Sequence, residues 1–237
     1  GGSRTNTGKP FLANDPHLSI QNPSVWYEIH LDAPDLHIAG VTFVGVPGVV
    51  LGHNDRIAWG ATNSEVDVQD LFIEKINPNN PRQYEYQGQW LDGTVWREEI
   101  RVRGQAEPVV HEILVTRHGP IITAGVSDRI SQPVALRWTA HDPGTLFRSV
   151  AMLWTARNWQ DFQAAMRLWD VPSQNIVYAD IDGNIGYQMP GRIPVRAGGE
   201  GSAPVNGWTG EYEWTGWIPY DDLPAAYNPA KGFVATA

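Results

Sequence analysis

The chain has 237 residues, enough for a substantial buried core, and 42% of them are hydrophobic, as in an ordinary globular protein. Its formal net charge is −9, and lysine and arginine form no stripe along the sequence. This argues against nucleic-acid binding, because a surface that binds nucleic acid must neutralise phosphates. The absence of cysteine excludes disulfides and thiol chemistry. No apolar run reaches the length of a membrane span.

The first 140 residues read mostly as β structure. Short apolar or alternating runs, several of them bounded by glycine, are typical of strands. The segment Leu91-Asp92-Gly93-Thr94 predicts a hairpin, because Asp-Gly between two β-rich segments is a strong turn signal. The strands expected in this half are residues 41–44, 57–61, 68–76, 83–90, 95–103, 109–115 and 133–139.

One long helix is expected over residues 145–169, where apolar residues recur at three- and four-residue spacing and Pro172 marks the end. Residues 175–180 and 184–188 then predict a second hairpin around Asp182-Gly183. The remainder, rich in glycine, proline and tryptophan, reads as covering loops. We therefore expect a mostly antiparallel α+β fold, with residues 1–237 forming a single domain.

Five motifs in order carry a family resemblance. They are Gly8-Lys9-Pro10-Phe11-Leu12-Ala13-Asn14-Asp15-Pro16-His17-Leu18, Gly45-Val46-Pro47-Gly48, Gly52-His53-Asn54-Asp55-Arg56-Ile57-Ala58-Trp59-Gly60-Ala61-Thr62-Asn63, Tyr178-Ala179-Asp180 and Gly183-Asn184-Ile185-Gly186-Tyr187. In this order and spacing they resemble the β chain of the penicillin acylase (penicillin amidase) family, which are N-terminal-nucleophile hydrolases. The stock motifs of other hydrolases, such as G-x-S-x-G and H-E-x-x-H, do not occur.

The resemblance implies a four-layer αββα sandwich and hydrolysis of a small-molecule amide. In the family, a precursor cleaves itself, and the serine so exposed attacks the amide with its own α-amine as base. That serine lies a few residues before the position of Gly1, and an oxyanion-stabilising asparagine follows the position of Ala237. The nucleophile is therefore expected outside this chain, which would need an α chain and the rest of the β chain as partners. A periplasmic or secreted location is implied, and the acyl donor stays open between a β-lactam side chain, an acyl-homoserine lactone and another amide.

Two catalytic residues follow from the resemblance. By itself, Asn14-Asp15-Pro16-His17 reads as a turn in which Asn and Asp bond their own backbone. In the family, the residue matching His17 lies near the nucleophile, where it polarises the serine hydroxyl or holds a water. The residue matching Asn63 donates its backbone N–H to the oxyanion, and such a fixed donor contributes about 3 kcal/mol. Both could equally be structural, and His53 is interpreted as a scaffold residue.

A metal site is the third implication. From composition alone, residues 65–70 read as the solvated polar face of an exposed edge. Calcium-binding members of the family supply two aspartates and two main-chain carbonyls at positions that match Asp67, Asp70, Gln69 and Pro194. Calcium takes six to eight oxygen ligands, so the others are expected from outside this chain or from water.

The acyl pocket is also assigned by matching positions. Leu18, Leu51 and Trp154 match residues that line the acyl side chain, and Gln174 lies nearby in sequence, although each could be ordinary core. Members that accept a glutaryl group carry arginine at the position of Leu51, so leucine disfavours an acidic acyl group. The alternative function is a secreted β-rich carbohydrate- or ligand-binding module, suggested by eleven tryptophans.

Overall fold

A computed structural model describes residues 1–16, 18–126 and 130–237. The chain divides into two compact units. The first unit comprises residues 1–66, 143–192 and 218–237, and the second comprises residues 67–142 and 193–217. That residues 1–237 form one domain stays a prediction.

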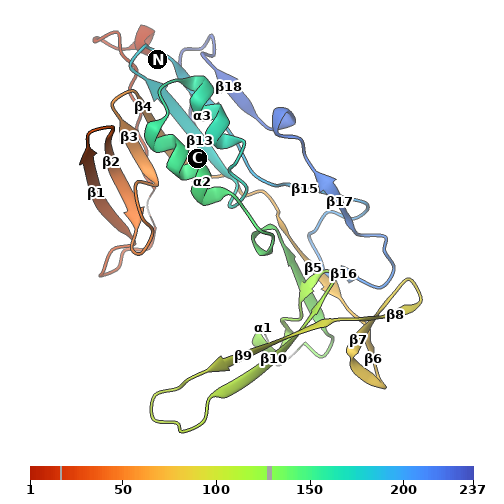
Figure 1. Cartoon of the computed structure of the whole chain (residues 1–237). Helices are drawn as coiled ribbons and strands as arrows, with labels where there is room; N and C mark the ends of the chain where they lie inside the picture. Colours follow the sequence, from red (N-terminus) through yellow and green to blue (C-terminus); the bar gives the residue numbers. More distant parts are fainter. Residues whose placement is uncertain (17, 127–129) are drawn as a thin grey trace. The chain divides into compact units, whose positions relative to one another are not determined.

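The first unit is built on a seven-stranded antiparallel sheet in the order β1-β2-β3-β4-β13-β14-β18 (Figure 1). Neighbouring strands of this sheet are consecutive in the chain except at β4–β13 and β14–β18. The β4–β13 pair joins residues more than 110 positions apart at the centre of the sheet. The strands are β1 (Trp26–Ala33), β2 (Leu36–Phe43), β3 (Leu51–Asn54), β4 (Ile57–Asn63), β13 (Gln174–Asp180), β14 (Ile185–Gln188) and β18 (Ala225–Tyr227), with short 3-10 turns at Gly2–Arg4 and Tyr220–Asp222.

Two helices, α2 (Leu146–Thr155) and α3 (Trp159–Met166), lie side by side against this sheet (Figure 1). The prediction of one helix over residues 145–169 is wrong, because the chain is extended at Ala156 and Asn158 between the two helices. The Asn158 side chain accepts a hydrogen bond from the Asp161 backbone N–H at 2.9 Å, which caps the start of α3. An N-cap residue thus interrupts an otherwise continuous helical pattern.

The core of the first unit lies between the helices and the sheet. Aromatic rings dominate it: Trp159 stacks on Phe162 with centroids 5.1 Å apart and meets Tyr178 edge-on at 5.2 Å. Trp159 also stacks on Tyr227 with centroids 4.9 Å apart, so such contacts join α3 to β13 and β18. The buried residues of this core are Ile38, Val49, Leu51, Ile57, Trp59, Val150, Leu153, Ala156, Trp159, Phe162, Ala165, Met166, Trp169, Ile176 and Tyr178.

One side chain fixes the end of α2 to the β3–β4 turn. Asn54 Nδ2 donates to the carbonyls of Leu153, Trp154 and Ala156 at 3.2, 3.1 and 2.8 Å. Its Oδ1 accepts from the backbone N–H groups of the turn itself, at 2.8 and 2.9 Å. The carbonyls at a helix C-terminus lack partners within the helix, so Asn54 satisfies them and positions α2 over the sheet.

The second unit consists of small sheets, in the orders β12-β5-β16, β11-β10-β9, β6-β7-β8 and β15-β17. Only the β16–β5 pair is parallel among its described strands. The elements are β5 (Gln69–Ile73), β6 (Ile76–Asn77), β7 (Asn80–Tyr86), β8 (Gln89–Asp92), β9 (Thr94–Ile100), β10 (Val109–Thr116), β11 (Gly119–Pro120), α1 (Thr123–Val126), β12 (Val134–Trp138), a 3-10 turn at Thr139–His141, β15 (Pro194–Arg196), β16 (Val205–Asn206) and β17 (Trp214–Trp217).

The predicted hairpin around Asp92-Gly93 is wrong. The turn of the observed β7–β8 hairpin is Gln87-Gly88, with φ of 49° and 77°, and β9 pairs with β10 instead. Positive φ at both central residues matches the twist of a two-residue hairpin. The predicted hairpin around residues 182–183 is confirmed as β13–β14, where Asp180 accepts hydrogen bonds from two backbone N–H groups at 2.9 Å.

The β-rich architecture with two main helices agrees with the expected α+β class. Within the described residues, the first unit has one sheet and one layer of helices, so the four-layer αββα sandwich stays a prediction for a larger assembly. No helix in the described part of the chain is long and apolar enough to cross a membrane.

Candidate active-site region

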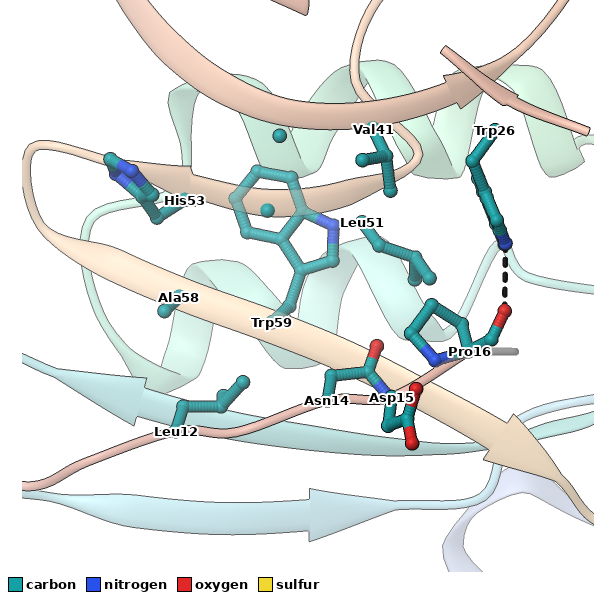
Figure 2. A pocket seen from close by; sticks show the side chains of 12 residues that line it. Leu12, Asn14, Asp15, Pro16, Trp26, Val41, Leu51, His53, Ala58 and Trp59 are labelled. Atoms are coloured by element: carbon teal, nitrogen blue, oxygen red, sulfur yellow. Dashed lines mark hydrogen bonds between the residues drawn. The ribbon is translucent and has the colours of Figure 1, made fainter. Parts of the chain in front are cut away.

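A pocket of about 500 Å³ opens in the first unit between the N-terminal segment and strands β2 to β4 (Figure 2). Its wall is mostly apolar. Trp59 and Leu51 lie near the middle of the view, with His53 and Trp26 on opposite sides (Figure 2). The lining residues are Leu12, Asn14, Asp15, Pro16, Trp26, Gly40, Val41, Leu51, Gly52, His53, Ala58 and Trp59.

The N-terminal segment is attached to β4 through Asn14. Asn14 Nδ2 donates to the Ala61 carbonyl at 2.8 Å, and its Oδ1 accepts from the Ala61 N–H at 3.0 Å. Strand β3 pairs with β4 only as far as Trp59, and beyond that point the Asn14 amide takes the place of a neighbouring strand beside β4. A Cβ atom at Gly60 would lie 2.7 Å from the Asn14 Cβ, so glycine is needed for this close approach. The described hydrogen bonds of the Asn14 side chain thus go to Ala61 and not to its own backbone, and the expected turn of residues 14–17 extends beyond the described residues.

A second contact fixes the segment just before residue 17. The Trp26 indole N–H donates to the Pro16 carbonyl at 2.7 Å, as the dashed line in Figure 2 marks. Asp15, between these two anchors, also lines the pocket. His17, the first predicted catalytic residue, lies outside the described residues, and its role stays a prediction.

Asn63, the second predicted catalytic residue, is the exposed last residue of β4, two positions beyond Ala61. The Asn175 Nδ2 donates to the Asn63 carbonyl at 2.8 Å, and Tyr187 donates its hydroxyl to Asn175 Oδ1 at 2.7 Å. Burial raises the pKa of Tyr187, so its hydroxyl stays a proton donor. This chain of hydrogen bonds fixes the Asn63 carbonyl, which belongs to the peptide unit between Asn63 and Ser64 and not to the one that carries the Asn63 N–H. The role of that N–H as an oxyanion donor stays a prediction.

The predicted pocket residues are not all brought together. Leu51, only 7% exposed, lines the pocket. Gln174 pairs with Asn63 across the β4–β13 ladder, and its Nε2 lies 3.2 Å from Asn63 Oδ1. Trp154 does not line this pocket; its indole N–H donates to the Val49 carbonyl at 2.8 Å. Leu18 is exposed and does not line the pocket either.

The predicted metal residues lie in the second unit, and two of them share a cation from the protein itself. The Arg196 guanidinium forms two hydrogen bonds of 2.8 Å with Asp70 and lies 3.3 Å from Asp67 Oδ2. The hydrogen bonds that Arg196 donates to Asp70 raise the pKa of Arg196 above its ordinary value, so it stays charged. Gln69 begins β5 and Pro194 begins β15, which belong to different sheets of the second unit. Calcium at this place stays a prediction.

A buried cluster that the sequence analysis did not single out also lies in the second unit. His118 Nδ1 is 2.8 Å from Glu74 Oε1, and His118 Nε2 is 2.9 Å from Glu213 Oε1. The imidazole stacks on Phe72 with centroids 4.0 Å apart. Because 44 and 95 residues separate the partners, no local sequence pattern signals this cluster.

Comparison with known proteins finds relatives that are named as acylases. The sequence model described as penicillin amidase matches residues 1–237. The chain is 34% identical to the acyl-homoserine lactone acylase QuiP of Pseudomonas aeruginosa, over 99% of the chain and 29% of that protein. It is 32% identical to penicillin G acylase of Escherichia coli, over 99% of the chain and 27% of that protein.

The fold is similar to a solved acylase. The thermostable penicillin G acylase from Alcaligenes faecalis matches with a TM-score of 0.80 and 33% identity, over 92% of this chain and 39% of that one. The chain therefore spans about three-tenths of the length of the curated relatives it matches.

Proposed function

From the premise that the chain belongs to the penicillin amidase family, we propose that it forms part of an enzyme that hydrolyses linear amides. The observation that carries this proposal is the family match over residues 1–237, together with 33% identity and a TM-score of 0.80 to a penicillin G acylase. The tryptophan content suggested a ligand-binding module, but no comparable observation supports that function.

The proposed chemistry is acyl transfer to water. A serine outside residues 1–237, exposed by self-cleavage of a precursor, attacks the amide carbonyl, and its own α-amine takes the proton. An α-amine suits this task because it titrates near neutral pH. The tetrahedral intermediate then carries negative charge on the former carbonyl oxygen, and water releases the acid.

Within this chain, we assign the Asn63 backbone N–H to the oxyanion and His17 to the surroundings of the serine hydroxyl. Two features support these roles. Asn63 ends a strand that pairs with β13, and Asn175 donates to its carbonyl. The segment that leads to His17 is attached to β4 by Asn14 and to Trp26 by Pro16. A donor that is fixed in advance needs no reorganisation when charge develops.

The acyl group is proposed to be uncharged and apolar. Leu51 and Trp59 give the pocket an apolar wall, and no arginine or lysine lies among its lining residues. A carboxylate placed there would lose its hydration without gaining a cationic partner. The relatives are named as an acyl-homoserine lactone acylase and a penicillin G acylase, so the acyl donor stays open between an acyl-homoserine lactone, a β-lactam side chain and another amide.

The remaining assignments concern the whole protein. We propose that an α chain and the rest of the β chain come from the same precursor and complete the site. A periplasmic or secreted location is part of the same proposal, and its test is fractionation of cells that express the full gene.

The central experiment uses the full-length precursor with the serine upstream of Gly1 replaced by alanine. We expect the wild type to process itself into two chains and to release the chromogenic amine from a phenylacetyl or octanoyl amide, and the variant to do neither. Turnover that persists in the serine-to-alanine variant would contradict the serine mechanism. The acylase assignment would be contradicted if the processed wild type hydrolysed none of the phenylacetyl, octanoyl, glutaryl and homoserine-lactone amides.

A further inference from the structure

The carboxylates of Asp67 and Asp70 converge on one point, and that point holds a nitrogen of Arg196. Arg196 Nη2 lies 2.8 Å from Asp70 Oδ1 and 3.3 Å from Asp67 Oδ2. It also lies 3.4 Å from the Asp67 carbonyl oxygen. A cation that bridged the two carboxylates would have to occupy the same place as this nitrogen.

The other carboxylate oxygens are already engaged. Asp70 Oδ2 accepts from Arg196 Nε at 2.8 Å and from the Trp214 indole N–H at 2.6 Å. Asp67 Oδ1 accepts from the Gln69 backbone N–H at 3.2 Å. Asp70 is only 5% exposed and still has donors on both oxygens, so its charge is compensated without any ion from solvent.

The backbone closes over the same three groups. A Cβ atom at Gly201 would lie 2.6 Å from Asp70 Oδ1 and 2.7 Å from Arg196 Nη2, and closer still to Asp67 Oδ2. Gly201 has φ of 78°, so only glycine suits this position in both conformation and space. Calcium needs six to eight oxygens at 2.3–2.6 Å, whereas the point between the two carboxylates holds Arg196 Nη2, although the Asp67 side chain itself is 46% exposed. These residues, in this arrangement, do not fit a calcium ion.

We propose that Arg196 is the permanent cation of this site, so that Asp67, Asp70 and Trp214 hold the second unit together without a metal. A guanidinium suits this role because it is charged at every physiological pH and bonds a carboxylate with two parallel hydrogen bonds. The cluster ties β5, where Asp70 lies, to β15 and β17, which carry Arg196 and Trp214. This inference is independent of the proposed amide hydrolysis, because it concerns what stabilises the fold and no step of the reaction.

The test is the calcium response of the complete mature enzyme. We expect the melting temperature of the wild type to be the same after dialysis against EDTA and after addition of calcium chloride, and metal analysis to find no stoichiometric calcium at this site. Arg196→Ala should lower the melting temperature. It should also create a calcium-dependent rise, since it leaves two carboxylates and a free space between them, and Arg196→Ala/Asp70→Asn should lose that rise. Arg167→Met, which removes an exposed arginine paired with Asp221, is the matched control and should show no calcium response.

Two outcomes decide the matter if Arg196→Ala does not fold. A wild-type enzyme that is destabilised by EDTA, restored by calcium and made insensitive by Asp67→Asn would overturn the proposal. A calcium response that survives Asp67→Asn belongs to another site, and together with an intact wild-type cluster it supports the proposal. The melting temperature and metal content are read without any activity assay, so failure of the acylase proposal would leave both results unchanged.

Discussion

The side-chain amide of Asn14 forms two hydrogen bonds with the backbone of Ala61, of 2.8 Å to its carbonyl and 3.0 Å from its N–H. A side chain thereby takes the place of a strand along part of β4. The pair links the segment before His17 to the strand that ends at Asn63, and so connects the two residues to which catalytic roles are assigned.

Asn14→Ala should reduce kcat/KM of the whole enzyme by roughly tenfold or more, because two hydrogen bonds contribute about 1–3 kcal/mol to holding this segment. Asn14→Asp should be at least as harmful, since a carboxylate would face the Ala61 carbonyl. The measurement is steady-state hydrolysis of a chromogenic amide, alongside the melting temperature. Asn6→Ala, at an exposed position of the same segment, is the control. Equal activity of Asn14→Ala and Asn6→Ala would show that the attachment has no functional role.

Local patterns predicted the parts of the fold that depend on neighbouring residues. The turn at residues 182–183 was predictable because Asp180 bonds N–H groups two and four residues away. The Asp92-Gly93 prediction failed because the chain turns earlier, at Gln87-Gly88. This turn was missed because the usual sequence signal for a two-residue hairpin turn is Asn or Asp before glycine, and the chain has glutamine there. Asn158 is a residue type that favours helix N-caps, but the apolar residues on both sides of it keep helical spacing, so the pattern predicted one continuous helix.

The candidate site was predictable only in part. Leu51 and Asn63 follow from matching family positions, whereas the attachment of Asn14 to Ala61 depends on residues 47 positions apart. The same holds for Arg196, which is 126 residues from Asp70. Long-range pairs of this kind arise from how strands are arranged in the fold, and a single sequence contains no periodicity that reports them.

His118 should be important for the stability of the second unit. It is 2% exposed and lies between Glu74 and Glu213, and a neutral imidazole has one N–H whereas both ring nitrogens face a carboxylate oxygen. His118→Phe keeps an aromatic ring against Phe72 but leaves the buried Glu74 carboxylate with only the Thr116 hydroxyl as a donor, which should cost about 3 kcal/mol or more.

The measurement for His118→Phe is thermal unfolding of the whole enzyme. Glu74→Gln/His118→Phe should recover part of the loss, since it removes the unpaired buried charge. His111→Phe, at an exposed position on β10, is the matched control and should change stability by no more than about 0.5 kcal/mol. A His118→Phe protein as stable as the control would contradict the structural role.

Asp180 should make the first unit sensitive to acid. Burial alone would raise its pKa, but hydrogen bonds from Asn184 and Tyr178 outweigh burial and lower the pKa below the ordinary value of 3.8. A carboxylate with a lowered pKa in the folded state stabilises the fold above its unfolded pKa, and that contribution is lost as the pH falls through the folded pKa. Asp180→Asn should therefore cost about 1–3 kcal/mol at neutral pH, and the difference from wild type should shrink below pH ~4.

The pH series of melting temperatures should include Asp182→Asn as control. Asp182 is exposed and pairs with Arg56 at 2.7 Å, and such a surface ion pair contributes little. Its effect should be small at every pH. A deficit of Asp180→Asn that is the same at pH 3 as at pH 7 would mean that packing, and not ionisation of the carboxylate, is what the substitution removes.

The acyl preference of the whole enzyme should depend on Leu51. Leu51 is 7% exposed and shares the pocket wall with Trp59, so an apolar acyl group that replaces water there gains about 0.8 kcal/mol for each methylene buried. A glutaryl carboxylate would lose its hydration with no cation to meet it. We expect kcat/KM for octanoyl and phenylacetyl amides to exceed that for the glutaryl amide of the same amine by roughly tenfold or more.

Leu51→Arg should narrow or reverse that ratio, while Leu51→Met, which keeps an apolar side chain of similar volume, should retain it. Both variants need a melting temperature beside the kinetics, because Leu51 also belongs to the core and a buried arginine destabilises it. If Leu51→Arg folds and its ranking of the three amides equals that of Leu51→Met, then Leu51 does not contact the acyl group, and the pocket between the N-terminal segment and strands β2 to β4 is not the acyl site.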